Sequence, residues 1–129
     1  DKINSIEEHY IMSEEKKEKL SFNEYQKHAY NLISEDGKKD MLTNGVLGLA
    51  GECGECCDIV KKYKYQKHDL DKEHLKDELG DVLWYLAETA SALGITLEEV
   101  AQFNLDKLHA RYHGETWSKN DDVNRKDKL

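Results

Sequence analysis

The sequence predicts an all-α fold, a helical bundle whose two core helices run antiparallel. The 129 residues contain no proline and no stretch in which apolar and polar residues alternate as in a strand. Several segments instead place apolar residues three or four positions apart, which is the period of an amphipathic helix. We expect one domain at residues 21–117, with a charged arm or helix at 1–20 and a polar tail at 118–129.

The composition limits the class of protein further. Charged residues make up 36% of the chain, and no apolar run approaches the ~20 residues of a membrane-spanning helix. The formal charge of −8 argues against nucleic-acid binding, which normally needs a basic face. Three cysteines, an odd number, argue against a secreted disulfide framework. We therefore expect a cytoplasmic protein that binds neither nucleic acid nor a membrane.

The first helix begins at a capping box. Ser21 precedes Glu24 by three residues, a spacing in which the two side chains satisfy backbone N–H groups at the helix start. We expect this helix to end near Leu32 and a break to follow at Ser34–Lys38. A second helix should run from about Met41 to Tyr65.

Two further helices follow in the same way. The third should span about Lys72–Leu93 and end at Gly94, because glycine is favoured just after a helix C-terminus. Thr96 and Glu99 form a second capping box, which opens a fourth helix through roughly Tyr112. The short polar connection before the third helix makes it an antiparallel neighbour of the second.

The stretch GLAGECGECCD lies inside the second helix. Its apolar residues keep the helical period with their neighbours, so we read it as a helix whose thiols lie on or beside the apolar stripe. That stripe contains Val46, Ala50, Cys53, Cys57 and Val60. Core packing of the thiols is favoured, since buried cysteine behaves as a small hydrophobe. A zinc site made with His109 and His113, or redox chemistry, stays open as the alternative.

Two pairs of acids flank this apolar face. Glu52 and Glu55 stand three apart on the second helix, and Glu78 and Asp81 stand three apart on the third. Antiparallel packing would bring all four carboxylates to one level of the bundle. Such clustered charges repel unless a cation lies between them, and oxygen ligands favour Mg²⁺ or Mn²⁺. Gly48 and Gly51 each precede one acid of the first pair by a turn, which opens the helix surface to a ligand or a neighbouring helix.

The fourth helix carries a donor and two cations on one face. Asn104, Lys107 and Arg111 share this stripe, and such groups suit phosphate oxygens. Alone, the stripe would be an ordinary solvated surface.

These motifs resemble those of one family, the MazG-like all-α nucleoside triphosphate pyrophosphohydrolases. The E-x-x-E and E-x-x-D pairs lie within "GLAGECGE" and "DELGDVLWYL", and "FNEYQKHA" and "NLDKLHARY" are similar to flanking helices of the family. The resemblance covers roughly residues 22–113. Cysteines follow each glutamate of the first pair, which is a mild departure from the pattern.

The resemblance implies a function and a set of site residues. Family members cleave nucleoside triphosphates between the α and β phosphates, giving a monophosphate and pyrophosphate, and are typically homodimers or dimer-based tetramers with sites near subunit contacts. It implies that the four acids bind Mg²⁺, and that Glu52 or Glu55 also orients the attacking water. It assigns the remaining substrate contacts to phosphate-binding and nucleoside-binding side chains: Lys62, Asn104, Lys107 and Arg111 for phosphate, and Trp84 and Tyr85 for sugar or base.

Three other classes of protein share single features with this sequence. A di-iron carboxylate bundle is disfavoured because the chain has no Glu-x-x-His motif. A His-Asp phosphohydrolase is disfavoured because the dipeptide His68-Asp69 falls in a connection without a partner histidine nearby. A helical module that binds nucleotide or metal without turnover stays open, because a catalytically inactive relative would keep almost the same motifs.

Overall fold

The computed structural model describes residues 19–113 and 116–125, and these contain six helices and no strand. The helices are α2 (Phe22–Asn31), α3 (Glu35–Lys39), α4 (Met41–Tyr65), α5 (Lys72–Ala92), α6 (Leu97–Arg111) and α7 (Lys119–Val123). The predicted all-α class is confirmed. In this part of the chain no helix combines the length and the apolar character needed to cross a bilayer.

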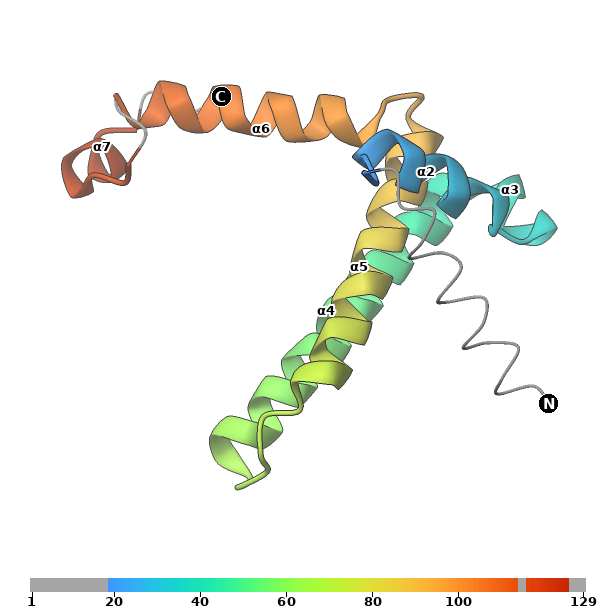
Figure 1. The fold of residues 1–129 in the computed structure, drawn as a ribbon, viewed down its shortest axis with the longest axis horizontal. Helices are drawn as coiled ribbons and strands as arrows, with labels where there is room; N and C mark the ends of the chain where they lie inside the picture. Colours follow the sequence, from blue (N-terminus) through green and yellow to red (C-terminus); the bar gives the residue numbers. More distant parts are fainter. Residues whose placement is uncertain (1–18, 114–115, 126–129) are drawn as a thin grey trace.

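Two long antiparallel helices form the axis of the molecule. α4 and α5 pack along each other as a hairpin, and α2 and the start of α6 join the hairpin at one end (Figure 1). α3 packs on α4 at this same end. α6 then projects away from the hairpin and carries α7 at its far end (Figure 1).

Local capping sets the helix boundaries. Asp40 and Asp71 accept hydrogen bonds from backbone N–H groups in the first turns of α4 and α5, and Thr96 with Glu99 forms a complete capping box on α6. Gly94 follows α5 with a φ of 69°, a left-handed conformation that glycine adopts without strain. The long helices therefore begin and end close to where the sequence predicts.

Two short helices were not predicted. α3 lies in the segment expected to be a break, and Ser34 caps it by accepting a hydrogen bond from the N–H of Gly37 at 3.0 Å. α7 lies in the expected polar tail, where the Asp122 carboxylate accepts a hydrogen bond from the Tyr112 hydroxyl at 3.0 Å. Helices of about one turn have too few residues for an apolar period, so only their caps could have signalled them.

The small core sits at the corner where α2, α5 and α6 meet. It is built on four buried residues from these helices: Ala29, Ala87, Ala90 and Leu97. Gln26 of α2 ties the corner together, since its amide donates to the carbonyl of Ile95 at 3.0 Å and accepts from the N–H of Leu97 at 2.8 Å. Beyond this corner the hairpin consists of α4 and α5 alone, and few of its residues are buried.

Close approach at two glycines sets the register of α4 against α5. A Cβ on Gly45 would lie 2.5 Å from the Oγ1 of Thr89, and a Cβ on Gly48 would overlap the ring of Tyr85. Each glycine costs ~1 kcal/mol relative to alanine inside a helix, so tight packing explains why these positions lack side chains. Gly51 and Gly54 have no atom within 4 Å of an added Cβ.

The apolar stripe predicted on the second helix is exposed. Val46 is 48% exposed and Val60 is 46% exposed, and both Cys53 and Cys57 are exposed while Cys56 is half-buried. The prediction that the thiols pack in the core is therefore wrong for the single chain. The physical reason is that α4 has one long neighbour, α5, and turns toward it the face that contains Gly45, Gly48 and Ile59.

The glycine contacts lead to the first testable prediction. Gly48→Ala should lower the free energy of unfolding by ~1–3 kcal/mol, because the added methyl group overpacks the contact with Tyr85. Gly54→Ala is the matched control and should raise it by ~0.5–1 kcal/mol, because only helix propensity changes there. Chemical denaturation of both variants checks this; a Gly48→Ala variant as stable as the parent would show that the contact does not constrain the register.

Candidate functional site

Three carboxylates from two helices meet on the hairpin. Glu52 of α4 and Glu78 and Asp81 of α5 each offer an oxygen, and these oxygens lie within 4.8 Å of one another. Glu52 and Glu78 are half-buried and Asp81 is exposed. Among the described residues this is the one group of three or more acidic, histidine or cysteine side chains close enough to hold a metal ion.

The helix register explains why these three acids meet. Glu52 stands one turn after Gly48, whose close contact with Tyr85 aligns α4 with α5. Asp81 stands one turn before Tyr85 and Glu78 stands three residues before Asp81, so both face the same level of α4. The glycine contacts therefore place Glu52 opposite the second acidic pair.

The acids change each other's protonation. A hydrogen bond with Glu78 raises the pKa of Glu52 above its ordinary value, and burial and the charges of Asp81, Glu78 and Glu55 raise it further. Burial, followed by the charges of Asp77 and Glu78, raises the pKa of Asp81. The cluster therefore favours holding a proton, as expected for like charges that share one site. A divalent cation can take the place of that proton.

Glu55 lies at the edge of this cluster and not within it. Its side chain is exposed, and its charge raises the pKa of both Glu52 and Lys62, so it lies near each of them. The Nζ of Lys62 is 2.7 Å from Asp58 on the same helix, and this ion pair is the larger cause of its raised pKa. α4 thus presents a further carboxylate, Glu55, near Glu52, and a cation, Lys62, near Glu55.

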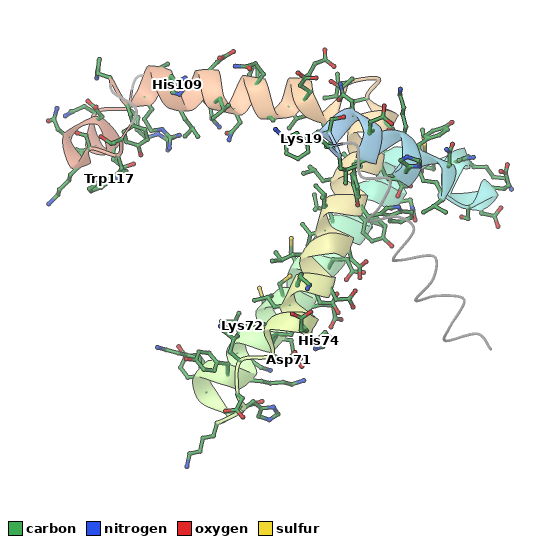
Figure 2. The ribbon with its side chains drawn as sticks, viewed as in Figure 1. Lys19, Asp71, Lys72, His74, His109 and Trp117 are labelled. Carbon is green, nitrogen blue, oxygen red and sulfur yellow. The ribbon has the colours of Figure 1, made fainter. Side chains whose placement is uncertain are left out.

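The polar stripe of α6 is not brought to the acids within this chain. Asn104 and Lys107 are exposed and Arg111 is half-buried with its guanidinium over the ring of Tyr112. His109, from the same part of α6, lies far from His74 in Figure 2. Because His74 contacts Glu78, it marks the position of the acid cluster.

The two aromatic candidates have different surroundings. Tyr85 packs on Gly48 of α4, and its ring meets that of Trp84 edge-on with centroids 5.0 Å apart. Trp84 also packs on the core cluster and lines a cavity of about 530 Å³ together with Tyr25, Asp77 and Asp81. Tyr85 therefore lies one helical turn after Asp81, and Trp84 shares a cavity with Asp81.

Two neighbours of the acids were not predicted. His74 lies with its Nε2 3.2 Å from the Oε1 of Glu78, and their i, i+4 spacing on one helix was a usable signal. Burial raises the pKa of Tyr25, and the charge of Asp81 raises it further, which places Tyr25 near the cluster. No sequence spacing could have indicated this contact, because it depends on how α2 packs against α5.

The fold and the site define a helical protein whose carboxylates can hold a hard divalent cation. Residues 42–114, more than half of the chain, match the family model of the MazG nucleotide pyrophosphohydrolase domain, so the chain belongs to that family, as the sequence motifs predicted. A segment of 69 residues is 42% identical to "Gene 37 protein" of Mycobacterium phage L5. This match covers 50% of the chain and 60% of the phage protein. No solved structure matches the chain.

The raised pKa values give a prediction about stability and pH. An acid whose pKa is higher in the folded state destabilises the fold once it ionises, so this cost appears as the pH rises from its ordinary pKa through its raised value. In EDTA, Glu52→Gln should therefore be more stable than the parent at neutral pH, and the difference should vanish at pH values below the ordinary carboxylate pKa. Melting temperatures of both proteins across this pH range check it; a variant less stable than the parent at neutral pH would contradict the assignment.

The pKa of Asp58 is shifted in the opposite direction, and its effect on stability does not disturb the comparison between the two proteins. Lys62, with Lys61, lowers the pKa of Asp58, so its stabilising contribution is present at neutral pH and is lost as the pH falls. That contribution is the same in the parent and in Glu52→Gln. It therefore cancels when the two melting curves are subtracted.

Proposed function

We propose that this protein hydrolyses nucleoside triphosphates, ribo or deoxy, between the α and β phosphates and releases a nucleoside monophosphate and pyrophosphate. The observation that carries this proposal is the convergence of Glu52, Glu78 and Asp81 from two helices within a family of nucleotide pyrophosphohydrolase domains. A cytoplasmic location is part of the proposal, in keeping with three free thiols.

The three acids suit Mg²⁺, or Mn²⁺ in its place. Their oxygens are close enough to share one ion, and the raised pKa values indicate uncompensated negative charge that a cation would relieve. Glu52, Glu78 and Asp81 would hold the metal, and Glu55 lies at the edge of this group. The bound metal supplies charge neutralisation for the triphosphate and the departing pyrophosphate.

The remaining residues take roles in water activation and substrate binding. Glu55 orients the attacking water and accepts its proton, because it is exposed beside the cluster while Glu52 is drawn into it. The water oxygen bonds to the α phosphorus, and the bond to the bridging oxygen breaks with its electrons leaving on pyrophosphate. Lys62 attracts phosphate oxygens, and Trp84 and Tyr85 contact the nucleoside.

A homodimer, or a tetramer built from it, completes the fold in this proposal. Large apolar side chains are exposed along one side of the hairpin, at Leu42, Val46 and Val60 of α4, at Leu79 of α5 and at Leu93 just after α5. At about 100° per residue, this side lies about 60–120° around each helix from Glu52 on α4 and from Glu78 on α5. Two such hairpins packed by their apolar sides make a four-helix bundle, the usual arrangement for helices with one apolar face.

The second copy also supplies the missing cations. α6 contacts α2 and α5 near its start, and Lys107 lies ten residues further on, or about 15 Å along the helix. In a dimer, this projecting arm reaches the hairpin of the partner. We propose that Asn104, Lys107 and Arg111 bind phosphate at the acid cluster of the second copy.

The reaction itself gives the first test. With Mg²⁺ and a preferred nucleoside triphosphate, we expect monophosphate and pyrophosphate in equal amounts and no diphosphate, because the α–β bond is the one that breaks. Glu52→Gln and Asp81→Asn should abolish turnover while the far-ultraviolet circular dichroism stays helical. Separation of products by ion-exchange chromatography checks this. Diphosphate and orthophosphate would exclude the class, and metal-dependent nucleotide binding without turnover would favour the non-catalytic module.

The dimer proposal has its own test. Glu52→Gln chains and Lys107→Ala chains carrying different affinity tags should be co-expressed, and the mixed dimer purified through both tags. If α6 acts across the dimer, one site of each mixed dimer is intact, and activity should return to about half that of the parent while each variant alone stays low. Light scattering confirms that every sample is dimeric. An inactive mixed dimer would show that the two residues act within one chain.

A further inference from the structure

A buried carboxylate fixes the direction of an amide on α4. Glu88 of α5 is 2% exposed, and its Oε1 accepts a hydrogen bond from the Nδ2 of Asn44 at 2.7 Å. The carboxylate oxygen is the acceptor in this hydrogen bond, so the amide turns its NH₂ group toward Glu88. The Oδ1 of Asn44 then remains as an acceptor on the other side of the amide.

Asn44 lines a cavity on the same side of the hairpin as the acid cluster. This cavity has a volume of about 440 Å³ and lies between α3 and the start of α4. Its lining side chains are acidic, hydroxylic or amide groups with one leucine, and no lysine, arginine or histidine is among them: Ser34, Asp36, Asp40, Thr43, Asn44 and Leu47, with Gly37 and Gly48. Asp36 is paired with Lys39 at 2.7 Å, and Asp40 caps α4. The cavity thus offers acceptors to a ligand that brings donors.

The cavity and the proposed catalytic site lie along the same stretch of α4, since Gly48 lines the cavity and Glu52 follows it by one turn. Asn44, Gly48 and Glu52 follow one another on successive turns of α4, so the amide lies about 12 Å along the helix from the first acid. That length is comparable to the distance from the phosphorus of a nucleoside monophosphate to the far edge of its base, with one hydrogen bond added. A triphosphate held at Glu52 could therefore place its base against Asn44.

We propose that this cavity takes the base of the nucleotide and that Asn44, oriented by Glu88, selects bases with an exocyclic amino group at the edge it contacts. This inference rests on the proposed function and names its substrate class. Cytosine and uracil distinguish the possibilities best, because they have the same size and differ in a donor amino group against an acceptor carbonyl. The oxygen of Asn44 accepts from the first and repels the second, so cytidine nucleotides should be preferred.

The second oxygen of Glu88 determines which way the side-chain amide would turn in a Glu88→Gln variant. Its Oε2 is buried without a hydrogen-bond partner. In Glu88→Gln, an amide nitrogen at that position would leave two buried donors unpaired, which is less favourable than leaving an oxygen there. The new amide should therefore keep its oxygen at the unpartnered position and turn its nitrogen toward Asn44. Asn44 must then flip and present its NH₂ group to the cavity.

The experiment compares kcat/KM for CTP and UTP in four proteins. The parent should prefer CTP by about tenfold or more, Asn44→Ala should bring the ratio close to one, and Glu88→Gln should lower it by at least about tenfold, toward or past equality. Glu98→Gln is the matched control. Glu98 accepts a hydrogen bond at 2.9 Å from the amide of Asn23, which lines a different cavity, so this variant should keep the parent's ratio.

Each outcome decides for or against the proposal. A CTP/UTP ratio unchanged in Asn44→Ala would overturn it, and this exposed position keeps the test valid even if Glu88→Gln does not fold. Equal losses on both nucleotides in Glu88→Gln would show that Glu88 does not orient Asn44 for base selection and would overturn the proposal. A change in ribose against deoxyribose preference, with the base ratio constant, would place the sugar at Asn44 and also overturn it. If the parent hydrolyses no triphosphate, the proposed function fails, and equal calorimetric affinities for CTP and UTP would then overturn this inference separately.

Discussion

The alignment of α4 with α5 is the constraint on which the rest of the structure depends. Two glycines let the helices approach at Thr89 and Tyr85, and one residue of slippage would turn every side chain of α4 by about 100° relative to its neighbour. Glu52 would then face solvent instead of Glu78 and Asp81. The hairpin has few buried residues to hold this alignment, and the close contacts at Gly45 and Gly48 contribute to it directly.

The same alignment gathers charge that the isolated chain does not neutralise. Elsewhere on α4, Asp58 has Lys61 and Lys62 as partners and its pKa falls, which is the ordinary result for a surface carboxylate. Glu52 and Asp81 face other acids and their pKa values rise. Sites that store unfavourable electrostatic energy in the folded state are common where a cation or substrate binds, because binding relieves that energy. The contrast within one helix separates the acids of the site from the many acids of the surface.

Sequence alone predicted the elements whose cause is local. The ends of α4 and α5 follow from capping side chains and from Gly94, and the pairing of the acidic motifs follows from helical spacing. The burial of Cys53 and Cys57 was predicted wrongly, because an apolar stripe indicates that a partner exists without saying that the partner belongs to the same chain. The position of Glu55 at the edge of the acid group, and the contact of Tyr25 with Asp81, depend on side-chain packing between helices and have no local signal.

The positions of the exposed apolar side chains connect stability with function. Among the described residues, the cluster of buried apolar side chains lies at the corner of α2, α5 and α6, while Ile59 is buried in the far half of α4. The far half of the hairpin and the arm of α6 (Figure 1) also expose large apolar side chains that a folded domain normally covers. Phe103 is 69% exposed on the same arm that carries Lys107. A contact that buried this arm against a second copy would therefore gain apolar stabilisation and deliver cations to a cluster of acids in one step. Under that arrangement the monomer is both marginal in stability and incomplete in its chemistry, and assembly corrects both for the same physical reason.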